Sequence, residues 1–147
     1  MTAIRMIKIK DASQLLPLMK QLGYPQTLAN MEERLTICLE SGIYFCLAFE
    51  LNKEILGVCF FTVYPSCLKP TNRCIIEALV VDEKHRNQGI ATKLLQETES
   101  LARRKGCDSI SLTSNKGRGQ NIYNFYVNHG YKNDGLRAQW YLTKVIK

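Results

Sequence analysis

The chain has 147 residues, of which 46% are hydrophobic and 22% are charged. This length is typical of one domain with a single core, and the composition excludes a disordered or fibrous protein. The net charge of +7 is compatible with a nucleic acid, an acidic protein surface or a polyanionic small molecule as binding partner. The charge alone does not distinguish these partners. We treat residues 1–147 as a single domain, because no linker or internal repeat divides them.

The apolar runs and the cysteines indicate a cytoplasmic protein without a membrane segment. The apolar run Val58 to Tyr64, like the others in the chain, is much shorter than the ~20 residues that a membrane-spanning helix needs. No apolar region follows the positive residues near the N-terminus, so we expect no signal peptide. The six cysteines are scattered and form no C-x-x-C pair, so they are expected to be reduced, mostly buried and without a metal.

Periodicity predicts a strand and two helices at the start of the chain. The range Ile4 to Ile9 alternates apolar and polar residues, as a strand does. Asp11 is a candidate N-cap of the next helix, with Gln14 in the capping-box position and Gly23 at the helix end. Thr27 is expected to open a second amphipathic helix.

The rest of the chain alternates strands with two further helices. The expected elements are strands Ile43 to Leu51, Ile55 to Tyr64 and Cys74 to Val81, a helix after Gly89, a strand Ser109 to Thr113, a helix Gln120 to His129 and a strand Gln139 to Ile146. Tyr131-Lys132 is a candidate for an extra short strand. The order β-αα-βββ-α-β-α-β predicts a mixed α/β fold, with a central mixed sheet of about six to seven strands flanked by four helices.

The segment between the strand that ends at Val81 and the next helix is a candidate anion site. The first amides of a helix lack intrahelical partners, and the helix dipole is positive there. Gly89 has no Cβ to keep a phosphate from the backbone, Ala91 is also small, and Arg86 adds a positive charge. Gly89 could equally serve only to ease the turn from strand to helix, and the spacing alone does not decide between these readings.

Three motifs in order resemble the GNAT superfamily of N-acetyltransferases. His85-Arg86-Asn87-Gln88-Gly89-Ile90-Ala91 resembles the family's acetyl-CoA signature, Arg/Gln-x-x-Gly-x-Gly/Ala. The segment Glu77 to Glu83 resembles the family's fourth strand and its exit. The segment Phe125 to Tyr131 resembles its late Phe-Tyr-x-x-x-Gly-Phe motif. Together with the order of elements, the likeness extends over nearly the whole chain.

The resemblance implies that acetyl-CoA is the co-substrate and that no metal is used. The pyrophosphate would lie on the amides of Asn87, Gln88, Gly89, Ile90, Ala91 and Thr92, with Arg86 close by. The backbone of Leu79, Val80 and Val81 would pair with the pantetheine arm, since the fourth and fifth strands splay apart in this family. The implied reaction is direct transfer of the acetyl group to a primary amine.

Transfer from a thioester to an amine requires a base for the ammonium and favours an acid for the leaving thiolate. Glu77 is the only charge in the apolar run Cys74 to Val81, where burial would raise its pKa toward that of a useful base. The resemblance implies that Glu77 is this base. The alternatives are an ion pair with Arg73 or Arg137, or a position at a sheet edge.

Tyr126 matches the tyrosine that protonates the thiolate in this family. The alternative is that both Phe125 and Tyr126 are core aromatic residues, which we accept for Phe125. Tyr123, one helical turn earlier, is a weaker substitute for the acid.

The acceptor amine is the least determined part of this interpretation. In the family it is selected by the connection between the first two helices, residues 23–26 here, and by the loop before the last strand, residues 134–139. The compact chain favours a small-molecule amine over a peptide or protein amine.

A module of another class, which binds acyl-CoA without catalysis, is the second hypothesis. Nucleic-acid binding is not expected, because the basic residues between 103 and 118 lack interleaved aromatic residues. A homodimer is an expectation from the family.

Overall fold

The computed structural model describes residues 1–112 and 120–132. The chain divides into two compact units, Met1–Thr113 and Ser114–Lys147, and each is described by itself. The first unit contains β1 (Thr2–Met6), α1 (Ala12–Leu22), α2 (Leu28–Glu40), β2 (Tyr44–Leu51), β3 (Glu54–Pro65), β4 (Asn72–Val81), α3 (Ile90–Arg104) and β5 (Cys107–Leu112). Short 3-10 helices lie at Ile9–Asp11 and Glu83–His85, and α4 (Gln120–Asn128) belongs to the second unit. The single domain expected over residues 1–147 stays a prediction.

The strands of the first unit form one sheet in the order β1-β2-β3-β4-β5. β1 to β4 are antiparallel neighbours, and β5 is parallel to β4. The predicted mixed α/β fold is confirmed, although the described residues contain fewer strands than expected. Tyr131-Lys132 is not a strand, so that candidate is wrong. The strand expected at residues 139–146 lies outside the described residues.

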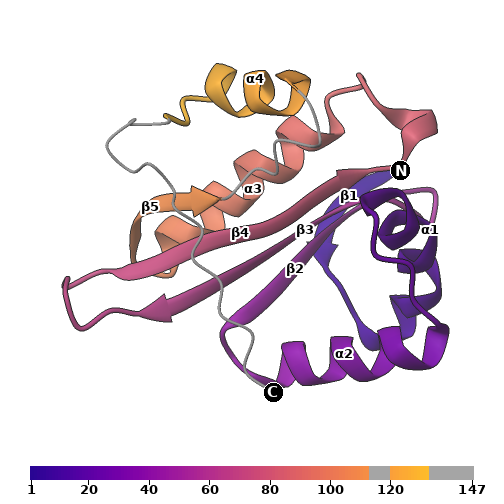
Figure 1. Ribbon diagram of the computed structural model, residues 1–147, viewed down its shortest axis with the longest axis horizontal. Coiled ribbons are helices and arrows are strands. Elements are labelled where there is room, and N and C mark those ends of the chain that lie inside the picture. Colours follow the sequence, from indigo (N-terminus) through magenta and orange to yellow (C-terminus); the bar gives the residue numbers. More distant parts are fainter. Residues whose placement is uncertain (113–119, 133–147) are drawn as a thin grey trace. The chain divides into compact units, whose positions relative to one another are not determined.

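α1 and α2 cover one face of the sheet, and α3 covers the other (Figure 1). Side chains of the two N-terminal helices form one buried cluster with Cys46, Ala48, Val58, Phe60 and Val80 of the sheet. The α3 face is tightly packed. A Cβ added to Gly57 of β3 would come within 3.1 Å of the side chains of both Ile90 and Leu94. Shape complementarity on that face therefore depends on a glycine opposite two branched residues.

The start of α1 differs from the sequence prediction. β1 ends at Met6, before the predicted Ile9, which instead opens a 3-10 helix. Asp11 makes no side-chain cap bond to α1 within the described part of the chain. Its carboxylate accepts a hydrogen bond from Arg5 at 2.8 Å, which lowers the pKa of Asp11. Gln14 accepts from the Ile55 backbone N–H at 2.8 Å. The predicted capping box is wrong, because tertiary partners use both side chains.

The six cysteines are free thiols, and Cys46, Cys59, Cys74 and Cys107 are buried. Burial raises the pKa of Cys59 and of Cys74 to about 12, so both are protonated packing residues at neutral pH. The described residues contain no group of three or more side chains placed to hold a metal ion. No helix among them has both the length and the apolar character needed to cross a membrane.

Candidate active site

β4 contains a β-bulge at Glu77. In the register with β3, Phe61 lies opposite Ile76 and Phe60 lies opposite Ala78, so Glu77 is an extra residue in β4. Side chains of a strand alternate between its two faces, and an extra residue shifts that alternation. As a result Glu77 and its neighbour Ala78 line the same cavity. Glu77 is exposed, so the expectation of a carboxylate buried in an apolar strand is wrong.

The cavity that Glu77 lines has a volume of about 340 Å³ and lies on the α1 and α2 face. Its walls are Met19 and Leu22 of α1, Tyr24 and Gln26 of the α1–α2 connection, Met31, Arg34, Leu35 and Cys38 of α2, and Tyr44, Phe60, Glu77 and Ala78 of the sheet. This volume lies within the roughly 300–1,000 Å³ of small-molecule pockets. The connection expected to select the acceptor thus forms part of the same cavity as the predicted base.

One wall of the cavity is positioned by the end of α1. Gly23 has a φ of 99° and caps the helix, and the Tyr24 N–H donates to the Met19 carbonyl at 2.9 Å. This pair of features is a Schellman cap, in which glycine tolerates the left-handed conformation. The cap sets where Tyr24 leaves the helix, and with it one side of the cavity.

Tyr44 holds the predicted base in place. Its hydroxyl donates a hydrogen bond of 2.7 Å to Glu77 Oε2. Burial, followed by this hydrogen bond, raises the pKa of Tyr44 above its usual range, so the hydroxyl stays a donor at neutral pH. Glu77 has no ion pair with Arg73 among the described residues. Arg137, the other predicted partner, lies outside them.

Sequence reasoning missed Tyr44. The available signal was its position in β2, since Tyr44 shares strand parity with Cys46 and Ala48 and therefore lies on the α1 and α2 face. Its contact with Glu77 crosses two strand pairings, and the sequence does not reveal the register of either one.

The exit of β4 is held by hydrogen bonds from other elements. Gln21 of α1 donates to Asp82 Oδ1 at 2.9 Å, and His85 Nδ1 lies 2.8 Å from Asp82 Oδ2. These bonds, first that of Gln21 and then that of His85, lower the pKa of Asp82. Arg86 Nε donates to the Val81 carbonyl at 3.1 Å. The loop that follows therefore begins from a defined position.

The predicted phosphate loop is exposed and adopts a left-handed turn. Residues 86–89 are all exposed, and Asn87 and Gly89 have φ angles of 61° and 79°. Gly89 is the N-cap of α3 and offers no side-chain cap, and a Cβ at this position would meet nothing within 4 Å. Ile90 is buried and anchors the helix start, whereas the backbone before it is open to a ligand. Ala91 and Thr92, next in the helix, are half-buried.

Among the described residues, the second half of β4 has an edge with no strand partner. In the described part of the chain, the pairing of β4 with β5 runs as far as Ile76 opposite Leu112, which is the last residue described before Gln120. The Asp82 N–H donates to a β3 carbonyl, so alternation directs the backbone groups of Leu79 and Val81 away from β3. Within residues 1–112 and 120–132, no strand pairs with this edge beyond Ile76. The pairing of the pantetheine arm with this edge stays a prediction.

Tyr126 lies in α4, within the second unit. Its ring makes edge-on contacts with Phe125 and Tyr131, at centroid distances of 5.2 and 5.6 Å. Its carbonyl accepts hydrogen bonds from the His129 and Tyr131 N–H groups, both at 3.0 Å. These contacts hold the ring within a small aromatic cluster of its own unit. Tyr123, the weaker candidate, is 41% exposed.

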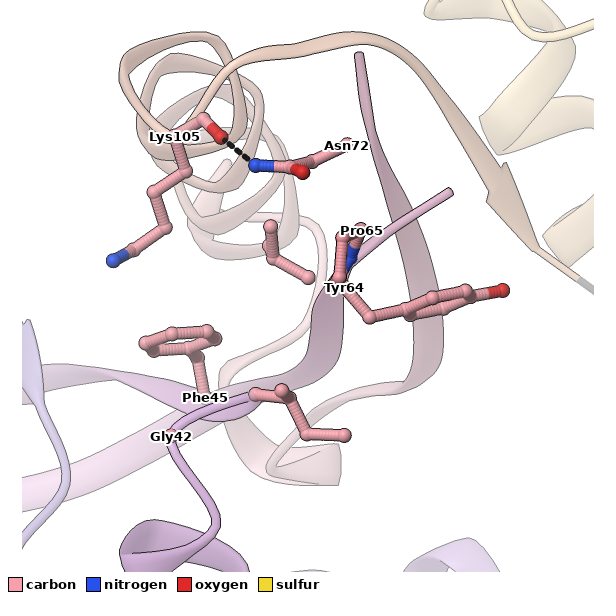
Figure 2. A pocket seen from close by; sticks show the side chains of 8 residues that line it. Gly42, Phe45, Tyr64, Pro65, Asn72 and Lys105 are labelled. Carbon is pink, nitrogen blue, oxygen red and sulfur yellow. Dashed lines mark hydrogen bonds between the residues drawn. The ribbon is translucent and has the colours of Figure 1, made fainter. Parts of the chain in front are cut away.

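A second cavity, of about 310 Å³, lies where β3 ends and β4 begins (Figure 2). The Asn72 side chain donates to the Lys105 carbonyl at 2.7 Å, and Lys105 Nζ lies 4.4 Å from the centroid of the Phe45 ring. These contacts join the end of α3 to the sheet. None of the residues predicted for catalysis or coenzyme binding lines this cavity, so the cavity at Glu77 is the candidate acceptor site.

Comparison with known proteins identifies the family. Residues 13–131 match the model of the Acetyltransferase (GNAT) family. No protein among the curated sequences matches the chain significantly. Among solved structures, a GNAT family acetyltransferase from Staphylococcus aureus is 24% identical with a TM-score of 0.75, covering 81% of this chain and 90% of that one.

Two further structures have the same fold at lower identity. Glucosamine-6-phosphate N-acetyltransferase from Arabidopsis thaliana is 18% identical with a TM-score of 0.77, covering 100% of this chain and 97% of that one. Ribosomal-protein-alanine N-acetyltransferase from Brucella melitensis is 16% identical with a TM-score of 0.75, covering 100% and 99%. These likenesses concern the fold, whereas the family match extends over most of the chain. The chain therefore belongs to the GNAT family of acetyltransferases and is an acyltransferase.

Proposed function

We propose that the protein transfers the acetyl group of acetyl-CoA to a primary amine on a small molecule. The observation that carries this proposal is the cavity of about 340 Å³ in which the Glu77 carboxylate is held by Tyr44. Family membership supplies the reaction type, and the cavity supplies a place for the acceptor beside a base.

The described residues fit a coenzyme with a pyrophosphate and a pantetheine arm. The open, left-handed backbone at Asn87 and Gly89 and the exposed Arg86 suit the pyrophosphate, with further amides from the first residues of α3. The pantetheine amides would pair with the backbone of Leu79 and Val81, which points away from β3. Val80 is buried against α1 and α2 and would support that edge.

The proposed chemistry needs no covalent enzyme intermediate. Glu77 accepts a proton from the ammonium, directly or through a water molecule, and the neutral amine attacks the thioester carbon. Attack forms the C–N bond and a tetrahedral intermediate, which then collapses as the C–S bond breaks. The thiolate leaves with a proton from Tyr126, and the second proton lost by the attacking nitrogen returns to Tyr126 through solvent. A backbone amide near Leu79 or Val80 stabilises the oxyanion of the tetrahedral intermediate.

Acceptor size is the point on which the alternatives differ. The similar folds described above include a glucosamine-6-phosphate N-acetyltransferase and a ribosomal-protein-alanine N-acetyltransferase, so the fold does not distinguish a small-molecule acceptor from a protein acceptor. The cavity favours a small molecule, because its walls come from both helices, their connection and the sheet. A peptide acceptor would be supported if peptides with free N-terminal amines were acetylated faster than small amines.

The test is release of the coenzyme thiol with an identified amine. Replacing Glu77 by Gln and, separately, Tyr126 by Phe should each lower kcat/KM by roughly 10²- to 10⁴-fold, the usual contribution of a general acid or base. Arg73→Gln, an exposed change in β4 outside the cavity, is the matched control. Near wild-type turnover in both variants would show the proposed roles to be wrong. Tight acetyl-CoA binding without turnover on a broad amine panel would favour the non-catalytic module.

A further inference from the structure

The cavity at Glu77 carries opposite charges on two of its walls. Arg34 projects from α2, and Glu77 projects from the bulge of β4. Neither belongs to a salt bridge among the described residues. Tyr44 occupies Glu77 Oε2, and the absence of a salt bridge leaves the second carboxylate oxygen and the Arg34 guanidinium for a ligand.

The thiol of Cys38 is influenced by the charges of both Arg34 and Glu77. Arg34 and Cys38 are one turn apart on α2, so both lie on the helix face toward the cavity. Burial raises the pKa of the Cys38 thiol, Arg34 opposes that rise and Glu77 adds to it. The thiol is thus within the electrostatic reach of both groups.

Buried apolar side chains form another part of the cavity wall. Met31 and Leu35 of α2, Met19 of α1 and Phe60 of β3 are buried and line the cavity. A ligand that fills the space therefore meets a cation, an anion and an apolar surface. A water-sized group occupies about 30 Å³, so the cavity has room for a ligand of on the order of ten non-hydrogen atoms.

We infer that the acceptor is an amine with a second, anionic group, separated from the amine by an apolar segment. This inference rests on the proposed function. The ammonium lies at Glu77, and the carboxylate or phosphate lies at Arg34, whose planar guanidinium binds either anion through paired hydrogen bonds. A diamine of the same length places its second charge against Arg34 and is rejected by like-charge repulsion.

The experiment compares acceptors that share an apolar chain and an amine. Hexylamine has no second charge, 6-aminohexanoate adds a carboxylate, 6-aminohexyl phosphate adds a phosphate, and 1,6-diaminohexane adds a cation. The wild-type protein should have a kcat/KM at least about 10-fold higher for one anionic amine than for hexylamine, the size expected for a charge-assisted hydrogen bond. Which anion gives the larger value distinguishes a carboxylate ligand from a phosphate ligand.

Arg34→Gln should remove this preference, lowering kcat/KM for the anionic amines about 10-fold while changing that for hexylamine less than about 3-fold. Arg34→Lys keeps the charge and should restore part of the preference. Lys20→Gln removes one exposed positive charge from α1 outside the cavity and serves as the control. Thermal unfolding of each variant checks that the fold is retained.

A binding measurement separates this inference from the proposed function. Calorimetric titration of 6-aminohexanoate and 6-aminohexyl phosphate into the CoA-bound protein needs no turnover. If no amine is acetylated but one of these ligands binds and Arg34→Gln abolishes that binding, the inference stands and the proposed function fails. Equal losses for hexylamine and the anionic amines in Arg34→Gln would overturn the inference. Absence of both an anion preference and Arg34-dependent binding would also overturn it.

Discussion

The two halves of β4 are both mostly apolar but have different surroundings. Residues 72–76 pair with β3 on one edge and β5 on the other, whereas residues 77–81 pair only with β3 in the described part of the chain. The bulge at Glu77 lies at the boundary between them. The first half is ordinary sheet interior. The second half carries the proposed base, an edge without a strand partner in the described part of the chain, and the exit to the predicted phosphate loop.

This difference shows how one strand can serve both stability and binding. An extra residue exposes a carboxylate without disturbing the apolar faces on either side, because Cys74 and Ile76 before the bulge lie on the same face as Leu79 and Val81 after it. Bulges commonly redirect a side chain next to a site. The bulge therefore explains an exposed Glu77 inside an otherwise apolar run.

Deletion of Glu77 is the sharpest test of this comparison and has the largest expected effect. Without the extra residue, regular alternation would place Ile76 and Leu79 on one face and Ala78 on the other. These are the faces that the three side chains occupy now, so the fold should persist. Acetyl transfer to an identified amine should fall more than about 10³-fold, since the base and its exposure are both lost. Kinetics and thermal unfolding measure the two effects, with Glu77→Gln as the variant that keeps the bulge. Global unfolding of the deletion variant would contradict this view.

Tyr44→Phe tests whether the second half of β4 depends on a neighbouring strand. Loss of the hydroxyl bond to Glu77 should lower kcat/KM roughly 10-fold, the value of one hydrogen bond to a charged group. The same change in a Glu77→Gln background should have little further effect, because the bond acts through that carboxylate. Additive losses in the double variant would show that Tyr44 acts on something other than Glu77.

Gly89→Ala tests the exit of the second half. Its φ of 79° disfavours a side chain, and the change should weaken acetyl-CoA binding about 5-fold, as roughly 1 kcal/mol of left-handed strain displaces the loop. Gly42→Ala is a matched control, since Gly42 has a φ of 75° and the same open surroundings but lies before β2. Calorimetry with acetyl-CoA should separate the two variants, and equal affinities would exclude a role for the loop.

Cys74→Ala tests the first half and has the smallest expected effect on function. Cys74 is 2% exposed, and removing its sulfur should lower the free energy of unfolding by about 1 kcal/mol. The kcat/KM and the affinity for acetyl-CoA should stay unchanged. A clear loss of either would show that the two halves are coupled, contrary to the comparison. Urea unfolding and steady-state kinetics provide the measurements.

Local signals predicted most elements well. Thr27 was expected to open α2, and its hydroxyl accepts from the Asn30 N–H at 3.2 Å. The strands predicted to end at Leu51 and to begin at Ile55 are joined by a turn at Asn52-Lys53, where both residues have positive φ. Such signals succeed because a cap or a tight turn is satisfied by residues that are neighbours in the chain. The capping box at Asp11 failed because Arg5 competed for the same carboxylate.

The sequence by itself predicted the order of the described elements and the motifs of the proposed site, among them the loop from Arg86 to Gly89 and Glu77 as the proposed base. Only the tertiary structure decided that Glu77 is exposed, that Tyr44 binds it and that Arg34 faces the same cavity. The physical reason is register. A bulge and a contact across strands depend on how β4 aligns with β3 and β2 and how α2 packs on them, and these alignments are set by the packing of the whole sheet rather than by neighbours in the chain.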